Sequence, residues 1–181
     1  MASFQNRVIG AIRLQASTFE EVEHDRAATL QAAMVVVAVA LAGSVVWFVY
    51  GGIIGLVRAV AFALIGWVIG AAVLLVVGTK LLPGKNTEAD MGQMLRTLGF
   101  AQSAGLFGIL GIIPFLGFLI QFVVWIWILV AMVIAVRQAL DYDDTMKAVV
   151  VCLVAWALMF VVTLVANMFG LGAAGIAGGM M

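Results

Sequence analysis

Long apolar runs separated by short polar segments dominate the chain, and the longest run carries no charge from Thr97 to Val136. A single helix over this stretch would be about 60 Å long, whereas the hydrocarbon core of a bilayer is about 30 Å thick. Proline disfavours helix in the residue before it, and glycine tolerates a reversal of the chain, so the sequence from Pro114 to Gly117 is the expected turn. We therefore predict a tight transmembrane hairpin with arms at 97–113 and 117–136.

Three further apolar runs are long enough to span a bilayer. They lie at 30–50, 59–78 and 148–168, and Gly51-Gly52 is expected to break the helix between the first two. Hydrophobic residues make up 66% of the chain and charged residues 10%, against about 25% charged residues in an average soluble domain. The predicted fold is an all-α integral membrane protein with five transmembrane helices in a domain over 30–168.

The segment before the first span is predicted to form a cytosolic amphipathic region over 1–29. Within it, 4–15 shows the pattern of a short interfacial helix, whose apolar side is formed by Phe4, Val8, Ala11 and Ile12. Ser17 followed by Glu20 matches a capping box and predicts the start of a second helix. A glycine-rich tail at 169–181 is expected to be poorly ordered by itself.

The positions of lysine and arginine predict the orientation. With five spans and a cytosolic N-terminus, eight of the nine basic residues lie on the cytosolic side, and only Arg58 lies outside. If 104–136 were a single span, the split would be six to three. Because positive charge in short loops is retained on the cytosolic side during insertion, five spans are favoured and the C-terminus is expected outside.

Small residues mark candidate helix contacts. Gly66 and Gly70 form a small-xxx-small pair in the second span, which suits either packing within the chain or a dimer face. Gly105, Gly108 and Gly111 recur every three residues in the first arm of the hairpin and predict a face of close helix contact.

Few polar side chains interrupt the spans. Gln102, Ser103 and Gln121 lie within the hairpin, and Asn167 lies in the last span. Polar groups in lipid need partners, so these side chains are expected to face other helices. A cavity lined by all four would instead favour a carrier.

Residues that carry chemistry are sparse. His24 with the nearby glutamates, and the group Asp141, Asp143 and Asp144, could suggest metal ions, but the spacing fits no specific ligand motif. A solvated helix start and an Asp143 or Asp144 N-cap explain these residues more simply. His24 and Cys152 lie in segments that cannot form a catalytic pair, and no charged residue lies in the middle of a span. We expect no enzyme activity, no catalytic residue, no cofactor, no metal site and no nucleic-acid partner.

The order of elements resembles the Yip (Ypt/Rab-interacting) domain family, and its bacterial branch in particular. The similarity runs from Phe19 to about Ala157, and its most characteristic part is LRTLGFA at 95–101 followed by the bend at Pro114. Family members often carry a proline near Ala104, which this chain lacks. The other similar stretches are FEEVEHDRAATLQAAMVV, LIGWVIGAAVLLVVGTKL and IWILVAMVIAVRQAL.

This resemblance implies five helices, a cytosolic N-terminus and no known enzymatic chemistry. It also implies a bacterial cytoplasmic (inner) membrane location. Eukaryotic relatives associate with small GTPases through a long N-terminal region, whereas this chain has about 29 residues there, which argues against GTPase binding. The expected function is a non-enzymatic scaffold or accessory subunit that packs against other membrane proteins or against itself in the lipid bilayer. The alternative is a small passive carrier or lipid-handling protein.

Overall fold

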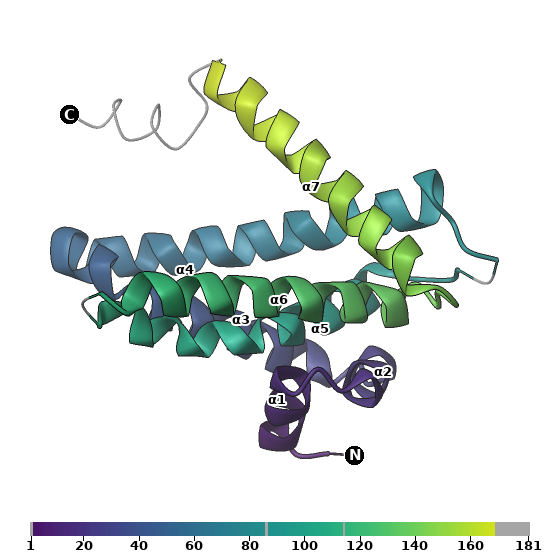
Figure 1. Cartoon of the computed structure of the whole chain (residues 1–181), viewed down its shortest axis with the longest axis horizontal. Helices are drawn as coiled ribbons and strands as arrows, with labels where there is room; N and C mark the ends of the chain where they lie inside the picture. The colour runs from purple at the N-terminus through teal and green to yellow at the C-terminus, as the bar shows by residue number, and fades with distance from the viewer. Residues whose placement is uncertain (1, 86, 114, 169–181) are drawn as a thin grey trace.

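The computed structural model describes residues 2–85, 87–113 and 115–168, and for 45–47, 49–51 and 166–168 it describes the backbone alone. These residues form helices and connecting turns, with no β-strand among them. The helices in chain order (Figure 1) are α1 (Phe4–Ile12), α2 (Ala16–His24), α3 (Ala28–Gly43), α4 (Val45–Val76), the π-helix η1 (Val77–Leu81), α5 (Met91–Ala101), the 3₁₀-helix η2 (Gln102–Ile112), α6 (Gly117–Ala139) and α7 (Thr145–Met168).

Four segments of the described chain are long and apolar enough to cross a membrane: Gly52–Leu81, Met91–Ile112, Gly117–Ala139 and Thr145–Val165. The all-helical membrane architecture is thus confirmed in its coarse form. The predicted first span at 30–50 falls on two consecutive helical pieces, the 16-residue α3 and the short helix 45–51, which are separated at Ser44. The count of five spans therefore stays a prediction.

The chain turns sharply at Gly52. This residue has φ 56° and ψ −148°, a conformation that side chains with a Cβ rarely adopt. The expected helix break at Gly51-Gly52 is confirmed at this position. The helix that follows is continuous through Val76 into η1, so it begins before the predicted second span at 59–78.

The charge-free stretch is divided into two helical arms, as the length argument predicted. The first arm is α5 continued by η2, and the second is α6, which begins at Gly117. Pro114, the predicted point of reversal, lies outside the described residues. A Cβ added at Gly117 would lie 2.1 Å from the carbonyl oxygen of Gly111, so the arms can close this tightly only because Gly117 is glycine.

The first arm changes from α-helix to 3₁₀-helix where its glycine repeat begins. A 3₁₀-helix has 3.0 residues per turn, so residues three apart lie in one line along it. Gly105, Gly108 and Gly111 therefore share one side of η2. A Cβ at Gly105 would lie 2.5 Å from Val39 Cγ1, whereas at Gly108 and Gly111 it would lie 3.6 and 3.7 Å from the Gln121 side chain.

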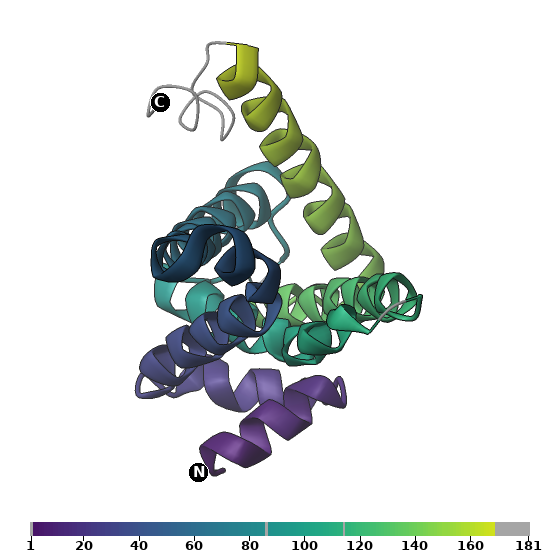
Figure 2. The same cartoon turned by 90° about the vertical axis from the view of Figure 1, so that its left-hand side faces the viewer.

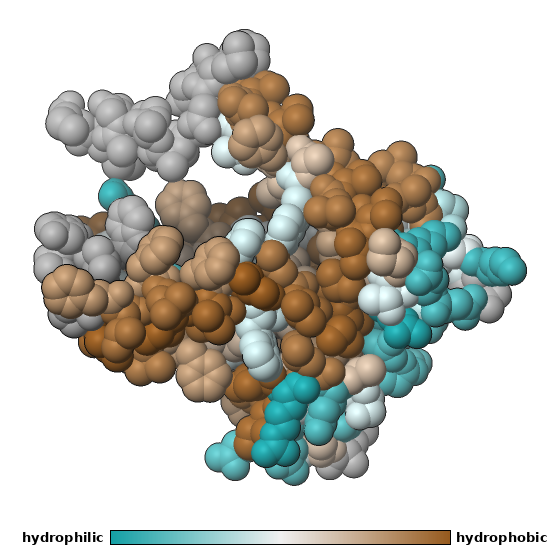
Figure 3. All heavy atoms as spheres, in the orientation of Figure 1, coloured by the Kyte–Doolittle hydropathy of each residue, from teal (hydrophilic) through white to brown (hydrophobic). Residues whose placement is uncertain are grey.

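The helices α3, α4, α6 and the α5–η2 arm lie side by side, whereas α7 diverges from them (Figures 1 and 2). The buried residues of α7 lie between Ala148 and Ala155, and the large hydrophobic side chains of 160–165 are exposed. Apolar side chains cover most of the surface seen in Figure 3, and polar ones gather at the right-hand end and along the lower side. This distribution is typical of a membrane protein.

The helices α1 and α2 pack against the side of the bundle. The rings of Phe4 and Phe100 meet edge to face with centroids 6.4 Å apart, and Trp127 Nε1 donates to the carbonyl of Ile12 at 2.8 Å. In α2, Phe19 and Val22 are fully buried, and the helix contacts α5 and α6. A helix at Phe4–Ile12 thus exists, and its position at a membrane interface stays a prediction.

We predict that Gly105→Leu destabilises the fold by about 1–3 kcal/mol, because a side chain there overlaps Val39. Gly66→Leu is the matched control, since a Cβ at Gly66 meets nothing within 4 Å. Thermal unfolding in detergent measures both. Equal melting temperatures for the two variants would contradict the close contact at Gly105.

Candidate functional site

Charged and polar side chains from distant parts of the sequence meet at one end of the bundle, which we call the polar end. They come from α1, α2, α5, the end of α6 and the turn before α7. Among the described residues no group of three or more His, Cys, Asp or Glu side chains could hold a metal ion. The residues of the polar end are Arg7, Glu20, Glu21, Glu23, Asp25, Gln93, Arg96, Arg137, Gln138, Asp141, Tyr142 and Asp143.

The start of α2 differs from the sequence prediction. The helix begins at Ala16 with Gln15 as its N-cap, and no side chain caps it, so the expected capping box of Ser17 and Glu20 is wrong. Leu14 has φ 58° and the Gln15 amide donates to the carbonyl of Gly10, so a tight turn leads the chain into the helix before Ser17. As expected, Asp144 acts as a cap, since its Oδ1 accepts from the Met146 amide at 2.9 Å.

A capping box does form at the start of α5. Asp90 Oδ1 accepts from the Gln93 amide at 2.8 Å, and Gln93 Oε1 accepts from the Asp90 amide at 2.7 Å. The amide nitrogen of the Gln93 side chain remains free to donate elsewhere, and it reaches across to α2.

Arg7 of α1 joins the N-terminal helices to one another. Its guanidinium is 2% exposed and donates to Glu21 at 3.0 Å, to Asp25 at 2.6 Å and to Gln31 at 2.9 Å. The hydrogen bond from Arg7 lowers the pKa of Asp25, and the Ala2 amide together with Arg7 lowers the pKa of Glu21. Both carboxylates are therefore ionised at neutral pH and hold α1 against α2, while the hydrogen bond to Gln31 connects α1 to α3.

Arg96 of α5 caps the C-terminal end of α2. Its side chain is 6% exposed, and Nε donates to the carbonyls of Val22 and Glu23 at 3.0 and 3.1 Å. A second donor, Nη2, also reaches the Glu23 carbonyl. The last carbonyls of a helix have no partner within it and carry partial negative charge, so a buried guanidinium suits them.

Glu23 is the most unusual group of the polar end. The residue is 1% exposed, its Oε1 accepts from Gln93 Nε2 at 3.1 Å, and its Oε2 has no hydrogen-bond partner among the described residues. Burial raises the pKa of Glu23 from 4.5 to about 7, and the negative charges of Asp141 and Glu20 add to this effect. The carboxyl therefore changes its charge near neutral pH.

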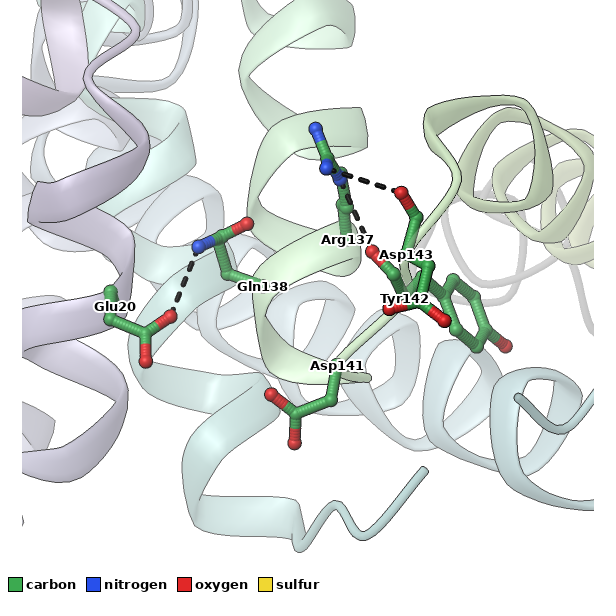
Figure 4. Close-up of a pocket in the computed structure, with 6 residues that line it drawn as sticks. All are labelled: Glu20, Arg137, Gln138, Asp141, Tyr142 and Asp143. Atoms are coloured by element: carbon green, nitrogen blue, oxygen red, sulfur yellow. Dashed lines mark hydrogen bonds between the residues drawn. The ribbon is translucent and has the colours of Figure 1, made fainter. Parts of the chain in front are cut away.

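An open cleft of about 480 Å³ lies between α2 and the turn that follows α6 (Figure 4). Glu20 accepts from Gln138 Nε2 at 3.0 Å across it, while Arg137 donates to the carbonyls of Tyr142 and Asp143 at 3.2 and 3.3 Å. Asp141 points away from Arg137 in Figure 4. The cleft is polar and open, and it holds no pair of residues arranged as a nucleophile and a base.

The Tyr142 hydroxyl closes the end of the π-helix. It lies 2.9 Å from the Gly78 carbonyl and 2.7 Å from the Leu82 carbonyl, and the residue is buried. A Cβ at Gly78 would lie 2.3 Å from Leu140 Cδ1, so η1 and the turn after α6 are in close contact. This turn is thereby fixed to η1 on one side.

A second surface feature is an apolar groove along α4, which we call the α4 groove. Gly66 and Gly70 lie in it, and a Cβ at either would meet nothing within 4 Å. Its volume is about 240 Å³. The rest of its lining is Phe62, Ala63, Trp67, Ala71, Leu74, Leu98, Gln102 and Met132.

Three of the four predicted polar side chains are described by the structure, and these three do not line one cavity. Gln102 lines the α4 groove, Ser103 is fully buried, and Gln121 lies against the glycines of η2. The side chain of Asn167 lies outside the described residues. Among the described residues there is thus no shared polar cavity of the kind that would have favoured a carrier.

The Yip1 domain matches residues 9–166, which include the C-terminal end of α1 and nearly all of α7. The chain belongs to the Yip1 domain family. No curated protein and no solved structure showed a significant match. The Yip1 domain is not a known enzyme family, and family membership together with the apolar helices identifies a membrane protein.

Sequence reasoning missed the central residues of the polar end of this Yip1 domain. The sequence indicates a solvated helix start around Glu23 and predicts no contact for Arg7 or Arg96, whereas all three residues are buried. The capping-box spacing of Asp90 and Gln93 was the available signal for the start of α5. Glu23 and Arg96 are 73 positions apart in the sequence, and nothing in their neighbouring residues indicates that they are in contact.

We predict that Glu23→Gln stabilises the Yip1 domain at pH 8. The pKa of Glu23 is about 7 in the folded protein, against 4.5 for an ordinary glutamate. Its contribution to the free energy of unfolding is therefore fully present below pH 4.5 and is lost as the pH rises through 7. The difference amounts to about 3 kcal/mol at most. Thermal unfolding in detergent should show the variant more stable at pH 8 and equal to the wild type at pH 4.5.

The matched control for this prediction is Glu88→Gln, because Glu88 is an exposed carboxylate. It should shift the melting temperature by the same small amount at both pH values. A Glu23→Gln effect that is independent of pH would show that Glu23 does not ionise in this range.

Proposed function

We propose that this Yip1 domain protein is a non-enzymatic scaffold or accessory subunit, and that a helix of a partner membrane protein lies in the α4 groove. The observation that supports this proposal is the open space at Gly66 and Gly70. Because an added Cβ at either glycine would meet nothing within 4 Å, both positions have room for a neighbouring helix on the apolar surface of α4. In membranes, such small-xxx-small faces let a second helix approach closely.

The lining of the α4 groove suits a helix in two ways. Phe62 is exposed and lines the groove together with the two glycines, so a partner helix can pack against its ring. The Gln102 amide also lies in the groove and can hydrogen-bond to a polar group of the partner, which lipid tails cannot do.

Copurification from native membranes in mild detergent tests the proposal. We expect membrane proteins, or a second copy of the chain, to copurify with the wild type and to be lost with Gly66→Leu and Gly70→Leu. Ile65→Leu is the matched control, because Ile65 is exposed on α4 outside the groove lining. A wild-type protein that purifies only as a lone monomer would contradict the proposal.

We also infer five spans in a bacterial cytoplasmic membrane, with the N-terminus in the cytosol and the C-terminus outside. The helical pieces 28–43 and 45–51 together reach about 35 Å, enough for a first span that ends at the Gly52 turn. This orientation also leaves eight of the nine basic residues on the cytosolic side. The polar end would then face the cytosol.

Cysteine labelling in intact cells tests this orientation. Single cysteines at Asp143 and at Gly179, each combined with Cys152→Ser, are treated with a membrane-impermeant maleimide. We expect labelling at position 179 and none at 143 until the cells are opened. Labelling of 143 but not 179 would overturn the orientation.

A further inference from the structure

The buried Glu23 carboxyl of α2 lies close to α5 and to Asp141 in the turn after α6. It extends from α2 and accepts a hydrogen bond from Gln93 of α5, and its second oxygen is buried without a partner among the described residues. An ionised carboxylate normally accepts several hydrogen bonds. The site therefore suits the neutral, protonated carboxyl, and it provides too few donors for the charged one.

The charged groups that face Glu23 come from every element around it. Glu20 and His24 lie on α2, Arg96 lies on α5, and Asp141 lies in the turn after α6. Arg96 directs Nε and Nη2 to backbone carbonyls, and its Nη1 lies 3.5 Å from Thr29 Oγ1, so it makes no hydrogen bond to the Glu23 carboxyl. An ionised Glu23 would therefore face two like charges without an ion pair of its own.

An open cleft lies between α2 and the turn after α6. Across it, Gln138 Nε2 at the end of α6 donates to Glu20 at 3.0 Å, and both side chains line the cleft. The opposite side of α2 is held more firmly, by Arg96 at its C-terminal carbonyls and by the Arg7 ion pairs. The turn itself is fixed to η1 through Tyr142.

We propose that Glu23 is a proton-controlled latch between α2 and the turn at 140–144. When Glu23 is protonated, α2 packs against this turn. When Glu23 loses its proton to solvent, α2 moves away from the turn and the cleft widens. Repulsion from Asp141 and Glu20 drives the separation. The separation lets water reach the carboxylate and supply the hydrogen bonds that the closed site lacks. The cleft lined by Glu20, Gln138 and Asp141 is thus wider at alkaline pH.

Distance measurement between spin labels on the full chain in lipid nanodiscs tests this proposal. The labels replace Ser17 on α2 and Met146 at the start of α7, both exposed, in a Cys152→Ser background. We expect the distance distribution to lengthen between pH 5.5 and 8.5 with a midpoint near 7, where burial and like charges place the pKa of Glu23. In Glu23→Gln the short distance should persist at both pH values.

Two controls keep the result decisive. A label pair at Lys85 and Met146 reports on the other side of the turn and should not change with pH. Asp141→Asn removes one of the like charges that drive the separation, so the distance should lengthen less at pH 8.5, with a midpoint at higher pH, even if Glu23→Gln does not fold. An unchanged distance in the wild type, the same pH-dependent change in Glu23→Gln, or an unmoved midpoint in Asp141→Asn would overturn the latch.

Discussion

The capping of α2 by the Arg96 guanidinium is the interaction on which the polar end depends. A helix that ends inside a protein leaves carbonyls without partners, and each one costs free energy when it is buried away from water. Arg96 supplies a positively charged, multi-donor group from α5 at this point. Because α5 is the start of the hairpin, this one side chain joins the N-terminal helices to the apolar domain.

The polar end combines two kinds of buried charge. Arg7 is surrounded by Glu21, Asp25 and Gln31, so its charge is compensated locally. Glu23 has one hydrogen-bond donor and two like charges nearby, so its charge is not compensated. The first arrangement fixes α1 to α2 over a wide pH range, and the second makes the packing of α2 sensitive to protonation.

The apolar domain has a similar contrast in how its glycines are used. At Gly105 and Gly117 the missing side chain is needed for contacts within the chain, with Val39 and with the Gly111 carbonyl. At Gly66 and Gly70 the same residue type faces an open groove. This open space at Gly66 and Gly70 is the reason for the partner helix that we propose in the α4 groove.

The sequence by itself determined the helical membrane class, the kink at Gly52 and the division of the charge-free stretch into two arms. These follow from local properties: the apolar length relative to bilayer thickness, the φ that glycine allows, and the family motifs. It also gave the three-residue glycine repeat, but not the 3₁₀ geometry that aligns it. Only the tertiary structure decided that Arg7, Glu23 and Arg96 are buried and that the space beside Gly66 is open. Burial depends on which helices meet, and local periodicity does not encode the pairing of distant helices.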